Sequence, residues 1–421
     1  MTIGTGEGSL SSIKACLKTA RILNLEDMMA GKLPYRIFDC DTHVNEQEDA
    51  FTRYIDPEFR DRAITFRPGF LHEARMNGEP LDEGSYVPEG ATVRPGSLKE
   101  FFAKMKNAKG EAPYEFMKWQ DWHLHRDARL KLMDEQNMEA CIVFPNTAVY
   151  ADGVIKAEDV AYANLRAFNE WFDDEWGFNF KERIYAPPFI SFRNVERAAE
   201  EVDWALKRGA RVFNLTTGHA FGRSPADPYF DPIWSRLNEA KAVVAYHLTD
   251  SGYNREVSVN WSEKGDAKFW EQSAWQWMNC YCDRAIMDTL SALVYGNLFG
   301  RFPNLKVISV EHGADWLPYF LKRLNKMRGM GRGGQWLGGP LKEKPSEIVK
   351  RHIAVTPFAE DNVADIAAKV GVDSLVLGSD FPHAEGLADP EEFVATMSSL
   401  SDADIRRVMR DNGRALLPVP A

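Results

Sequence analysis

The sequence lacks several features that mark particular classes of protein. No apolar run approaches the roughly 20 residues that cross a bilayer. The first 30 residues alternate polar and apolar side chains instead of forming the apolar core of a signal peptide. Five cysteines, an odd number scattered along 421 residues, do not make the disulfide framework of a small secreted protein. We therefore expect a cytoplasmic protein with no membrane partner.

Positive charge is also in short supply. The chain has 51 Lys and Arg residues against 62 Asp and Glu residues, a formal net charge of −11. Because no excess of cations is present to meet phosphates, we expect no nucleic-acid partner. No Gly-rich phosphate loop, internal repeat or heptad array is present, which excludes P-loop, solenoid and coiled-coil proteins. The 44% of hydrophobic residues suffices for a large core.

Eight short apolar runs recur along the chain, each followed by a helical pattern. They lie at residues 36–41, 140–145, 184–190, 211–215, 243–247, 306–312, 353–358 and 374–380. Eight such units are typical of a (β/α)₈ TIM barrel. We predict an α/β protein with a distorted barrel over residues 35–421 and an N-terminal helical arm over residues 1–34. A doubly wound open sheet is the alternative, but its G-x-G-x-x-G turn is missing after the first run.

Two spacings between the runs are too long for ordinary loops. They predict insertions at about residues 45–128 and 250–300, after the first and fifth strands, and both are rich in aromatic residues. Such insertions emerge at the carboxyl-terminal rim of a barrel, where substrate pockets form. A lid or pocket wall and a small satellite core are both compatible with this composition.

Polar residues of metal-ligand type end four of the predicted strands. Asp41 and His43 end the first and His247 ends the fifth. The sixth ends in Glu311 and His312, and the eighth in Asp380. Residues i and i+2 share a face of a strand, so Asp41 and His43 are expected to converge on one ion at the barrel mouth. By the same alternation, only one of Glu311 and His312 is expected to point inward.

Carboxylates combined with imidazoles indicate the kind of metal. This donor set suits one divalent ion, Zn²⁺ before Mn²⁺ or Fe²⁺, rather than Mg²⁺ or Ca²⁺. The fourth strand ends near Asn214 and has no lysine that could bridge a second ion. We predict Asp41, His43, His247 and Asp380 as ligands, and Asn214, Glu311 and His383 as supporting or substrate-binding residues.

Several motifs together resemble a known family. They are DCDTHV, LMDEQNMEACIVFP, DPYFDPIWSRLNEAKAVVAYH, GRFPNLKVISVEHGADWLPYFLKRL and LVLGSDFPHAEG. From about Tyr35 to Leu417 the chain is similar to the amidohydrolase-2 type of TIM-barrel metal-dependent hydrolases, which also includes nonoxidative decarboxylases.

The resemblance implies roles for single residues. Asp41 and His43 match the first-strand pair, His247 matches the fifth-strand metal ligand, and Asp380 matches an aspartate that both contacts metal and moves protons. His312 matches a histidine that acts in catalysis in the decarboxylases. Asp41 departs from the histidine or glutamate common at its position but keeps one anionic oxygen ligand.

Three functions remain open at this point. The leading hypothesis is metal-dependent hydrolysis of an amide, ester, thioester or C–C bond in a bulky hydrophobic or aromatic carboxylic substrate. Asp380 then takes the proton of the attacking water and His312 stabilises the oxyanion. The alternative is nonoxidative decarboxylation of an aromatic or unsaturated carboxylate, and the third is a non-catalytic metal-binding protein. The partner is a small-molecule substrate, and we expect a homodimer or higher homo-oligomer.

Overall fold

The computed structural model describes residues 33–417 with short gaps. The gaps are 67–69, 72–73, 78, 81–84, 87–90, 99–115, 268–270 and 282. The chain divides into two units, Met1–Arg36 and Ile37–Ala421. Residues 1–32 of the predicted helical arm lie outside the described residues. In the described ranges, no helix is both long enough and apolar enough to span a membrane.

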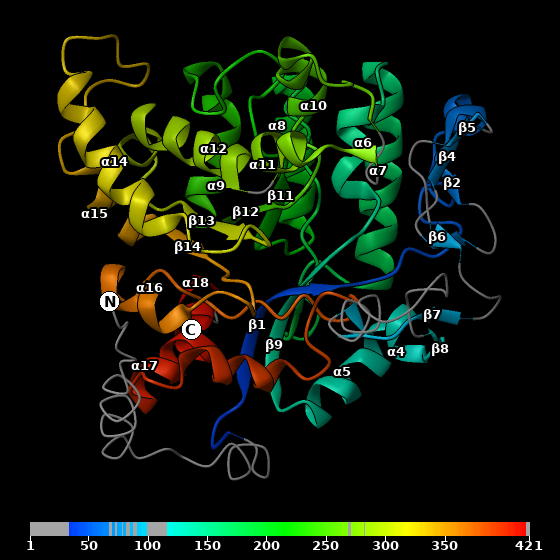
Figure 1. The fold of residues 1–421 in the computed structure, drawn as a ribbon. Coiled ribbons are helices and arrows are strands. Elements are labelled where there is room, and N and C mark those ends of the chain that lie inside the picture. The colour runs from blue at the N-terminus through cyan, green and yellow to red at the C-terminus, as the bar shows by residue number, and fades with distance from the viewer. Residues whose placement is uncertain are drawn as a thin grey trace, which may run out of the picture. The chain divides into compact units, whose positions relative to one another are not determined.

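Parallel strands form the centre of the second unit (Figure 1). One sheet has the order β1 (Ile37–His43), β9 (Met138–Phe144) and β10 (Ile184–Tyr185). The other has the order β11 (Val212–Leu215), β12 (Val243–His247), β13 (Lys306–Val310) and β14 (Ile353–Val355). Every pairing within these two sheets is parallel, and apart from the β1–β9 pair, which the first insertion separates, the paired strands are neighbours in chain order. This is the strand order of the predicted barrel.

Isolated bridges join the two sheets at both edges. Phe189 pairs with Asn214, which links the residues after β10 to β11. Leu375 pairs with Val355 of β14, and Phe381 pairs with Thr42 of β1. Residues 374–380 were predicted as a regular eighth strand, and that prediction is wrong in detail. The segment makes isolated bridges only, and its backbone leaves the extended conformation at Asp380, where φ is 56°.

Alternation along the strands places one set of side chains in the barrel interior. The buried interior cluster contains Phe38, Cys40, Ala140, Ile142, Phe144, Tyr185, Val212, Val243, Ala245, Ile308, Val310, Ala354, Val376 and Leu417. On β12, Val243 and Ala245 belong to this set, and His247 follows on the same face. The interior face therefore leads directly to a polar residue at the carboxyl end of the strand.

Helices pack between and around the strands. The longer ones are α5 (Arg126–Glu135), α7 (Glu158–Glu175), α8 (Val195–Lys207), α9 (Asp231–Glu239), α12 (Asp283–Tyr295), α14 (Leu317–Met330), α15 (Pro345–His352) and α16 (Val363–Val370). In α8 the residues Val195, Ala198, Ala199, Val202 and Ala205 are buried, which is the spacing of one apolar helix face. The side chain of Asn194 caps this helix by accepting a hydrogen bond from the Arg197 amide.

Shorter elements complete the chain. The insertion after β1 contains η1 (Pro57–Arg62), β2 (Thr65–Phe66), β3 (Phe70–Leu71), β4 (Ala74–Met76), β5 (Glu79–Pro80), β6 (Ser85–Tyr86), β7 (Ala91–Val93), β8 (Phe116–Lys118) and α4 (Asp121–Leu124). The insertion after β12 contains α10 (Tyr253–Glu256), η3 (Ser258–Trp261) and α11 (Ala274–Cys280), before α12 and α13 (Leu298–Arg301). The remaining elements are α6 (Ala148–Val154), η2 (Pro228–Phe230), η5 (Pro390–Met397), α17 (Asp402–Arg406), the π-helical turn η6 (Arg407–Asp411) and α18 (Asn412–Leu416).

Candidate metal centre

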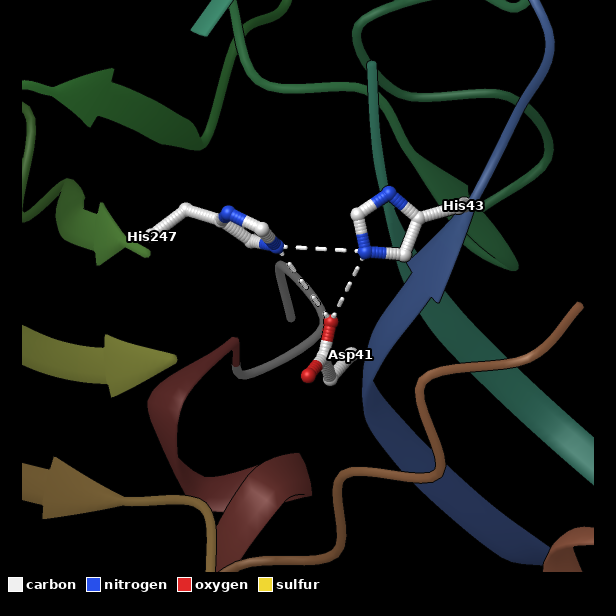
Figure 2. Close-up of side chains that lie close together, drawn as sticks. All are labelled: Asp41, His43 and His247. Atoms are coloured by element: carbon white, nitrogen blue, oxygen red, sulfur yellow. Dashed lines mark hydrogen bonds and ion pairs between the residues drawn. The ribbon is translucent and has the colours of Figure 1, made fainter. Parts of the chain in front are cut away.

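Three predicted ligands meet at the carboxyl ends of β1 and β12. Figure 2 shows the rings of His43 and His247 turned toward each other and toward the carboxylate of Asp41. The two Nε2 atoms lie 3.2 Å apart, and Oδ1 of Asp41 lies 3.5 Å from His43 Nε2 and 3.7 Å from His247 Nε2. All three side chains are buried.

Two further carboxylates complete the cluster. Oδ1 of Asp380 lies 3.3 Å from Nε2 of His43. Oε2 of Glu311 lies 3.1 Å from Nε2 of His247 and 3.9 Å from Nε2 of His43. The cluster therefore contains side chains from the carboxyl ends of β1, β12 and β13. Asp380 joins them from the segment that follows α16.

The spacing of these donor atoms fits a single divalent ion. Nitrogen and oxygen ligands about 2.1 Å from one ion lie roughly 3.0–3.4 Å from one another. The distances from His43 Nε2 to His247, Asp380 and Asp41 are close to that range. Oδ1 of Asp41 and Oδ1 of Asp380 are buried and face imidazole nitrogens, at 3.5 Å from Nε2 of His43 and 2.7 Å from Nδ1 of His383, respectively. Two imidazoles with carboxylates suit Zn²⁺, Mn²⁺ and Fe²⁺.

The hydrogen bonding of His247 favours a ligand role for its Nε2 atom. Its Nδ1 lies 2.9 Å from the Leu248 carbonyl oxygen, which can only accept a hydrogen bond. Nδ1 therefore carries a proton, and such a bond is the usual way in which a metal-binding histidine is oriented.

Glu311 and His312 correct the expectation drawn from strand alternation. Strand β13 ends at Val310, and Glu311 has a φ of 61°, so the alternation does not extend to these two residues. Glu311 contacts His247, while His312 is buried near enough to His247 and Asp41 for their charges to act on its pKa. Its Nδ1 lies 3.2 Å from the Ser309 hydroxyl, and its Nε2 has no partner among the described residues.

Burial and opposite charges set the pKa values in the cluster. Burial raises the pKa of Asp41, but hydrogen bonds and charges from His247 and His43 outweigh it and hold the pKa below its usual range. Burial lowers the pKa of His247, but hydrogen bonds to Asp41 and Glu311 raise it to about 10. Burial and the charge of His247 lower the pKa of His312 to about 3. Burial raises the pKa of Asp380 and of Glu311, so the cluster favours the anionic form for Asp41 alone among its three carboxylates.

His383 contacts the cluster through Asp380. Its Nδ1 lies 2.7 Å from Asp380 Oδ1, and its ring lies against that of His43 with the centroids 3.8 Å apart. Its Nε2 lies 2.8 Å from Oδ1 of Asn146. The Asn146 amide nitrogen donates to the Val44 carbonyl, so Oδ1 is left to accept from His383. The sequence pattern did not indicate Asn146, although it lies two residues after the end of β9.

Two further buried residues, Arg129 and Asp39, bond the backbone beside the cluster. Arg129 of α5 donates from Nη2 to the His43 carbonyl at 2.6 Å, and from Nε to the Trp122 carbonyl at 3.1 Å. Oδ1 of Asp39 accepts from the amides of Asp41 and Ser379, both at 3.1 Å. These bonds hold the backbone next to three of the predicted ligands.

Among the described residues, Asn214, His123 and His125 lie outside this network. Asn214 is buried on β11, and its side-chain nitrogen and oxygen make no hydrogen bond among the described residues, so no such bond ties it to the cluster. His123 belongs to α4, where its ring stacks on Trp122, and His125 precedes α5.

Comparison with known proteins identifies the family. Residues 120–419 match the model of the amidohydrolase family. The chain belongs to this family. The solved structure of an amidohydrolase from Mycobacterium avium subsp. paratuberculosis K-10 is similar, with 32% sequence identity and a TM-score of 0.78. The similarity covers 92% of this chain and all of that chain. The prediction of a distorted TM barrel is therefore confirmed.

Other similar proteins are described as decarboxylases. Decarboxylase macB of Penicillium terrestre is 22% identical over 282 residues, which is 62% of this chain and 77% of that protein. The 5-carboxyvanillate decarboxylase of Novosphingobium aromaticivorans DSM 12444, crystallised with manganese, has a TM-score of 0.60 at 16% identity, over 92% of this chain and 98% of that chain. The likeness to the 5-carboxyvanillate decarboxylase shows the fold alone, because only 16% of the residues are identical.

Proposed function

We propose that this amidohydrolase-family enzyme is a metal-dependent nonoxidative decarboxylase of an aromatic or unsaturated carboxylate. The similarity to proteins described as decarboxylases carries the choice of reaction, and the position of Asp380 supports the proton transfer that this reaction needs. The Oδ1 atom of Asp380 lies 3.3 Å from Nε2 of the predicted ligand His43 and 2.7 Å from Nδ1 of His383, which is not among the predicted ligands. One carboxylate can therefore share a metal site and exchange a proton with a neighbouring imidazole. The description of macB as a decarboxylase supports this class.

Asp41, His43 and His247 form one group of possible metal ligands, and Asp380 belongs to two overlapping groups, with His43 and His383 and with Asp41 and Glu311. We propose that Asp41, His43, His247 and Asp380 would hold one divalent cation. When bound, the cation supplies the positive charge that fixes the substrate carboxylate and an adjacent hydroxyl group. Zinc is the prediction from the donor set, and manganese is the metal in the 5-carboxyvanillate decarboxylase structure. The proposal therefore includes both metals as candidates.

In the proposed reaction the bond between the substrate carbon and its carboxylate breaks. The electron pair of that bond stays on the carbon, CO₂ leaves, and Asp380 gives the carbon a proton. His383 can return a proton to Asp380 through their 2.7 Å contact, while Asn146 holds the far side of its ring. Nε2 of His312, buried without a partner among the described residues, is free to bond a substrate oxygen.

Hydrolysis is the second candidate, because the 32% identical neighbour is described as an amidohydrolase. The same residues serve this reaction if Asp380 takes a proton from water instead of giving one to carbon. The two reactions differ in product, since only decarboxylation releases CO₂.

The test is CO₂ release from a panel of hydroxybenzoates by the purified protein loaded with Mn²⁺ or Zn²⁺. We expect release from at least one compound and a loss of about 10²- to 10⁴-fold in kcat for Asp380→Asn, the range for removing a proton-transfer group. Asp389→Asn, an exposed aspartate nearby in the sequence, is the matched control and should keep full activity. Turnover of esters or lactones with no CO₂ from any carboxylate would contradict the proposal and favour hydrolysis.

A further inference from the structure

A cavity lies beyond the carboxyl ends of β11 and β12. It has a volume of about 550 Å³, and the loops that follow these two strands contribute most of its wall. Tyr246 lines it, while its neighbour His247 belongs to the metal cluster. Successive residues of a strand point to opposite faces, so the cavity lies on the other side of β12 from the cluster. None of the five cluster residues lines it.

An aromatic ring is held at the mouth of this cavity. Phe221 is 49% exposed and has a φ of 48°, a backbone conformation that bulky residues rarely adopt. Hydrogen bonds between Ala220 and Arg223 close the tight turn that contains it. The guanidinium group of Arg193 lies 4.6 Å from the centre of the ring. The loop therefore presents the ring at the cavity instead of burying it in the core, and such strain is concentrated at ligand sites.

The floor of the cavity carries polar groups without partners. Thr217 and Tyr246 each line the cavity and are each 1% exposed. Neither hydroxyl makes a hydrogen bond within the described part of the chain. Buried polar groups nearly always have a partner, so two such groups beside one cavity favour a bound molecule that supplies it.

The charges around the cavity are already paired. Asp250 pairs with Arg255, and Glu256 pairs with His219. Asp152 pairs with Arg193, whose Nε lies 2.9 Å from its Oδ1. Among the described lining residues, an anionic ligand would therefore find no positive side chain that is not already paired with a carboxylate. The remaining wall is largely apolar and includes Ile190, Phe192, Leu215 and Pro225.

We propose that this cavity binds a neutral molecule with a ring and a hydroxyl or carbonyl group. The ring stacks on Phe221, and the polar group bonds the hydroxyls of Thr217 and Tyr246. The volume falls in the range of small-molecule sites. The site is separate from the metal centre and does not depend on the decarboxylase function.

The test is calorimetric titration of the metal-loaded protein with phenol, and with benzoate as the charged probe of similar size. We expect saturable phenol binding that the cavity variants weaken, while benzoate, an aromatic carboxylate that the proposed metal centre can also bind, keeps its affinity in those variants. Phe221→Ala should weaken phenol binding about three- to tenfold through the lost ring contact. Tyr229→Ala is the matched control, since Tyr229 is 45% exposed, lies under an arginine as Phe221 does, and does not line the cavity.

Two further variants test the floor and the location. Thr217→Val should weaken phenol binding about two- to tenfold, while Thr217→Ser should keep most of it. Asp380→Asn should bind phenol as the parent protein does, which separates this site from the metal centre. Unchanged affinity in both Phe221→Ala and Thr217→Val, loss of binding in Asp380→Asn, or no saturable binding at all would overturn the proposal.

Discussion

At the scale of single residues, Asp39 ties together the two parts of the chain that carry Asp41 and Asp380. Its Oδ1 atom accepts a hydrogen bond from one backbone amide of each part, those of Asp41 and Ser379, and the side chain is fully buried. Burial raises the pKa of this carboxyl to about 7. Because one buried carboxylate bonds both backbone segments, it fixes the distance between Asp41 and Asp380.

Replacing Asp39 should therefore weaken metal binding without touching a ligand. We expect Asp39→Ala to lose about 10- to 100-fold in metal affinity and roughly 2–4 kcal/mol in the free energy of unfolding, because two amides lose their acceptor. Asp39→Asn keeps an acceptor oxygen and should lose less. Metal titration and urea denaturation measure both effects.

The control for Asp39 is Asp389→Ala. Like Asp39, Asp389 accepts a hydrogen bond from the amide two residues later in the chain, that of Glu391, but its side chain is exposed. An Asp39→Ala protein that binds metal as tightly as the Asp389→Ala protein would contradict the supporting role.

Single residues also show what the sequence could and could not reveal about the centre. Asp41, His43, His247 and Asp380 were predicted because ligand-type side chains end apolar runs, and the structure brings all four together. Whether they bind metal stays a prediction. Arg129 lies within a helix and has no such pattern, because its role depends on a contact 86 residues away in the chain.

At the scale of elements, the segment after α16 is held against β1 and β14 by close packing at Gly378. A Cβ atom at this position would lie 2.7 Å from Thr356 Cβ and 3.0 Å from Asp41 Cβ. Only glycine allows the segment to approach both strands so closely. The same approach places Asp380, two residues later, at the cluster.

We expect Gly378→Ala to push these strands apart and to displace Asp41. The cost should be about 1–3 kcal/mol in the free energy of unfolding, the usual effect of overpacking, together with weaker metal binding. Thermal or urea denaturation measures the first effect. Gly333→Ala is the control, because a Cβ there meets no atom within 4 Å. Equal stability of the two variants would contradict this account.

The carboxyl end of α15 carries a buried histidine that should make stability depend on pH. His352 is 3% exposed, bonds the Leu305 carbonyl through Nδ1, and stacks on Phe299. Burial lowers its pKa in the folded protein below the usual 6.5. The unfolded chain therefore takes up this proton at higher pH than the folded chain does.

The contribution of His352 to stability is full above the unfolded pKa of about 6.5 and is lost as the pH falls below it. We expect His352→Phe to reduce the loss of stability between pH 7 and pH 5, measured by urea denaturation at each pH. The same substitution at the exposed His125 should leave that loss unchanged. A steeper fall in the His352→Phe protein would refute the assignment.

The elements also explain where sequence patterns stop being informative. Apolar alternation located β1, β9, β11 and β12 to within a few residues. The sixth and eighth runs were extended too far because Glu311 and Asp380 adopt positive φ, which is set by packing at the site and leaves no trace in hydrophobicity. Both residues that break the pattern belong to the cluster.

At the scale of the whole molecule, a group of exposed apolar side chains supports our proposal of a homo-oligomer. Val259, Trp261 and Met278 are 47%, 65% and 74% exposed and belong to η3 and α11, which contact each other. Exposed apolar side chains gathered in this way are typical of an interface. We propose a second copy of this chain as the partner.

Met278→Glu should shift the protein toward monomer at micromolar concentration, as measured by sedimentation velocity, because a charge would have to be buried in the contact. Met330→Glu is the matched control, since Met330 is 75% exposed and lies on α14. A parent protein that sediments as a monomer would contradict the oligomer proposal.

The barrel class was predictable from the sequence because eight apolar runs with helices between them have few compact solutions. Residues 99–115 and 1–32 lie outside the described residues, so the helical arm remains a prediction, and the choice between a lid and a satellite core for the first insertion stays open. Reaction class was not predictable from the ligands, because the same donors serve hydrolysis and decarboxylation.

The central claim is that Asp41, His43, His247 and Asp380 hold one divalent ion. The most direct test is metal analysis of protein purified without added metal, with an Asp41→Ala, His43→Ala double variant beside the parent. We expect close to one equivalent of zinc, manganese or iron in the parent and none in the double variant, with both proteins folded by circular dichroism. No metal in either protein after reconstitution, or equal metal in both, would contradict the account.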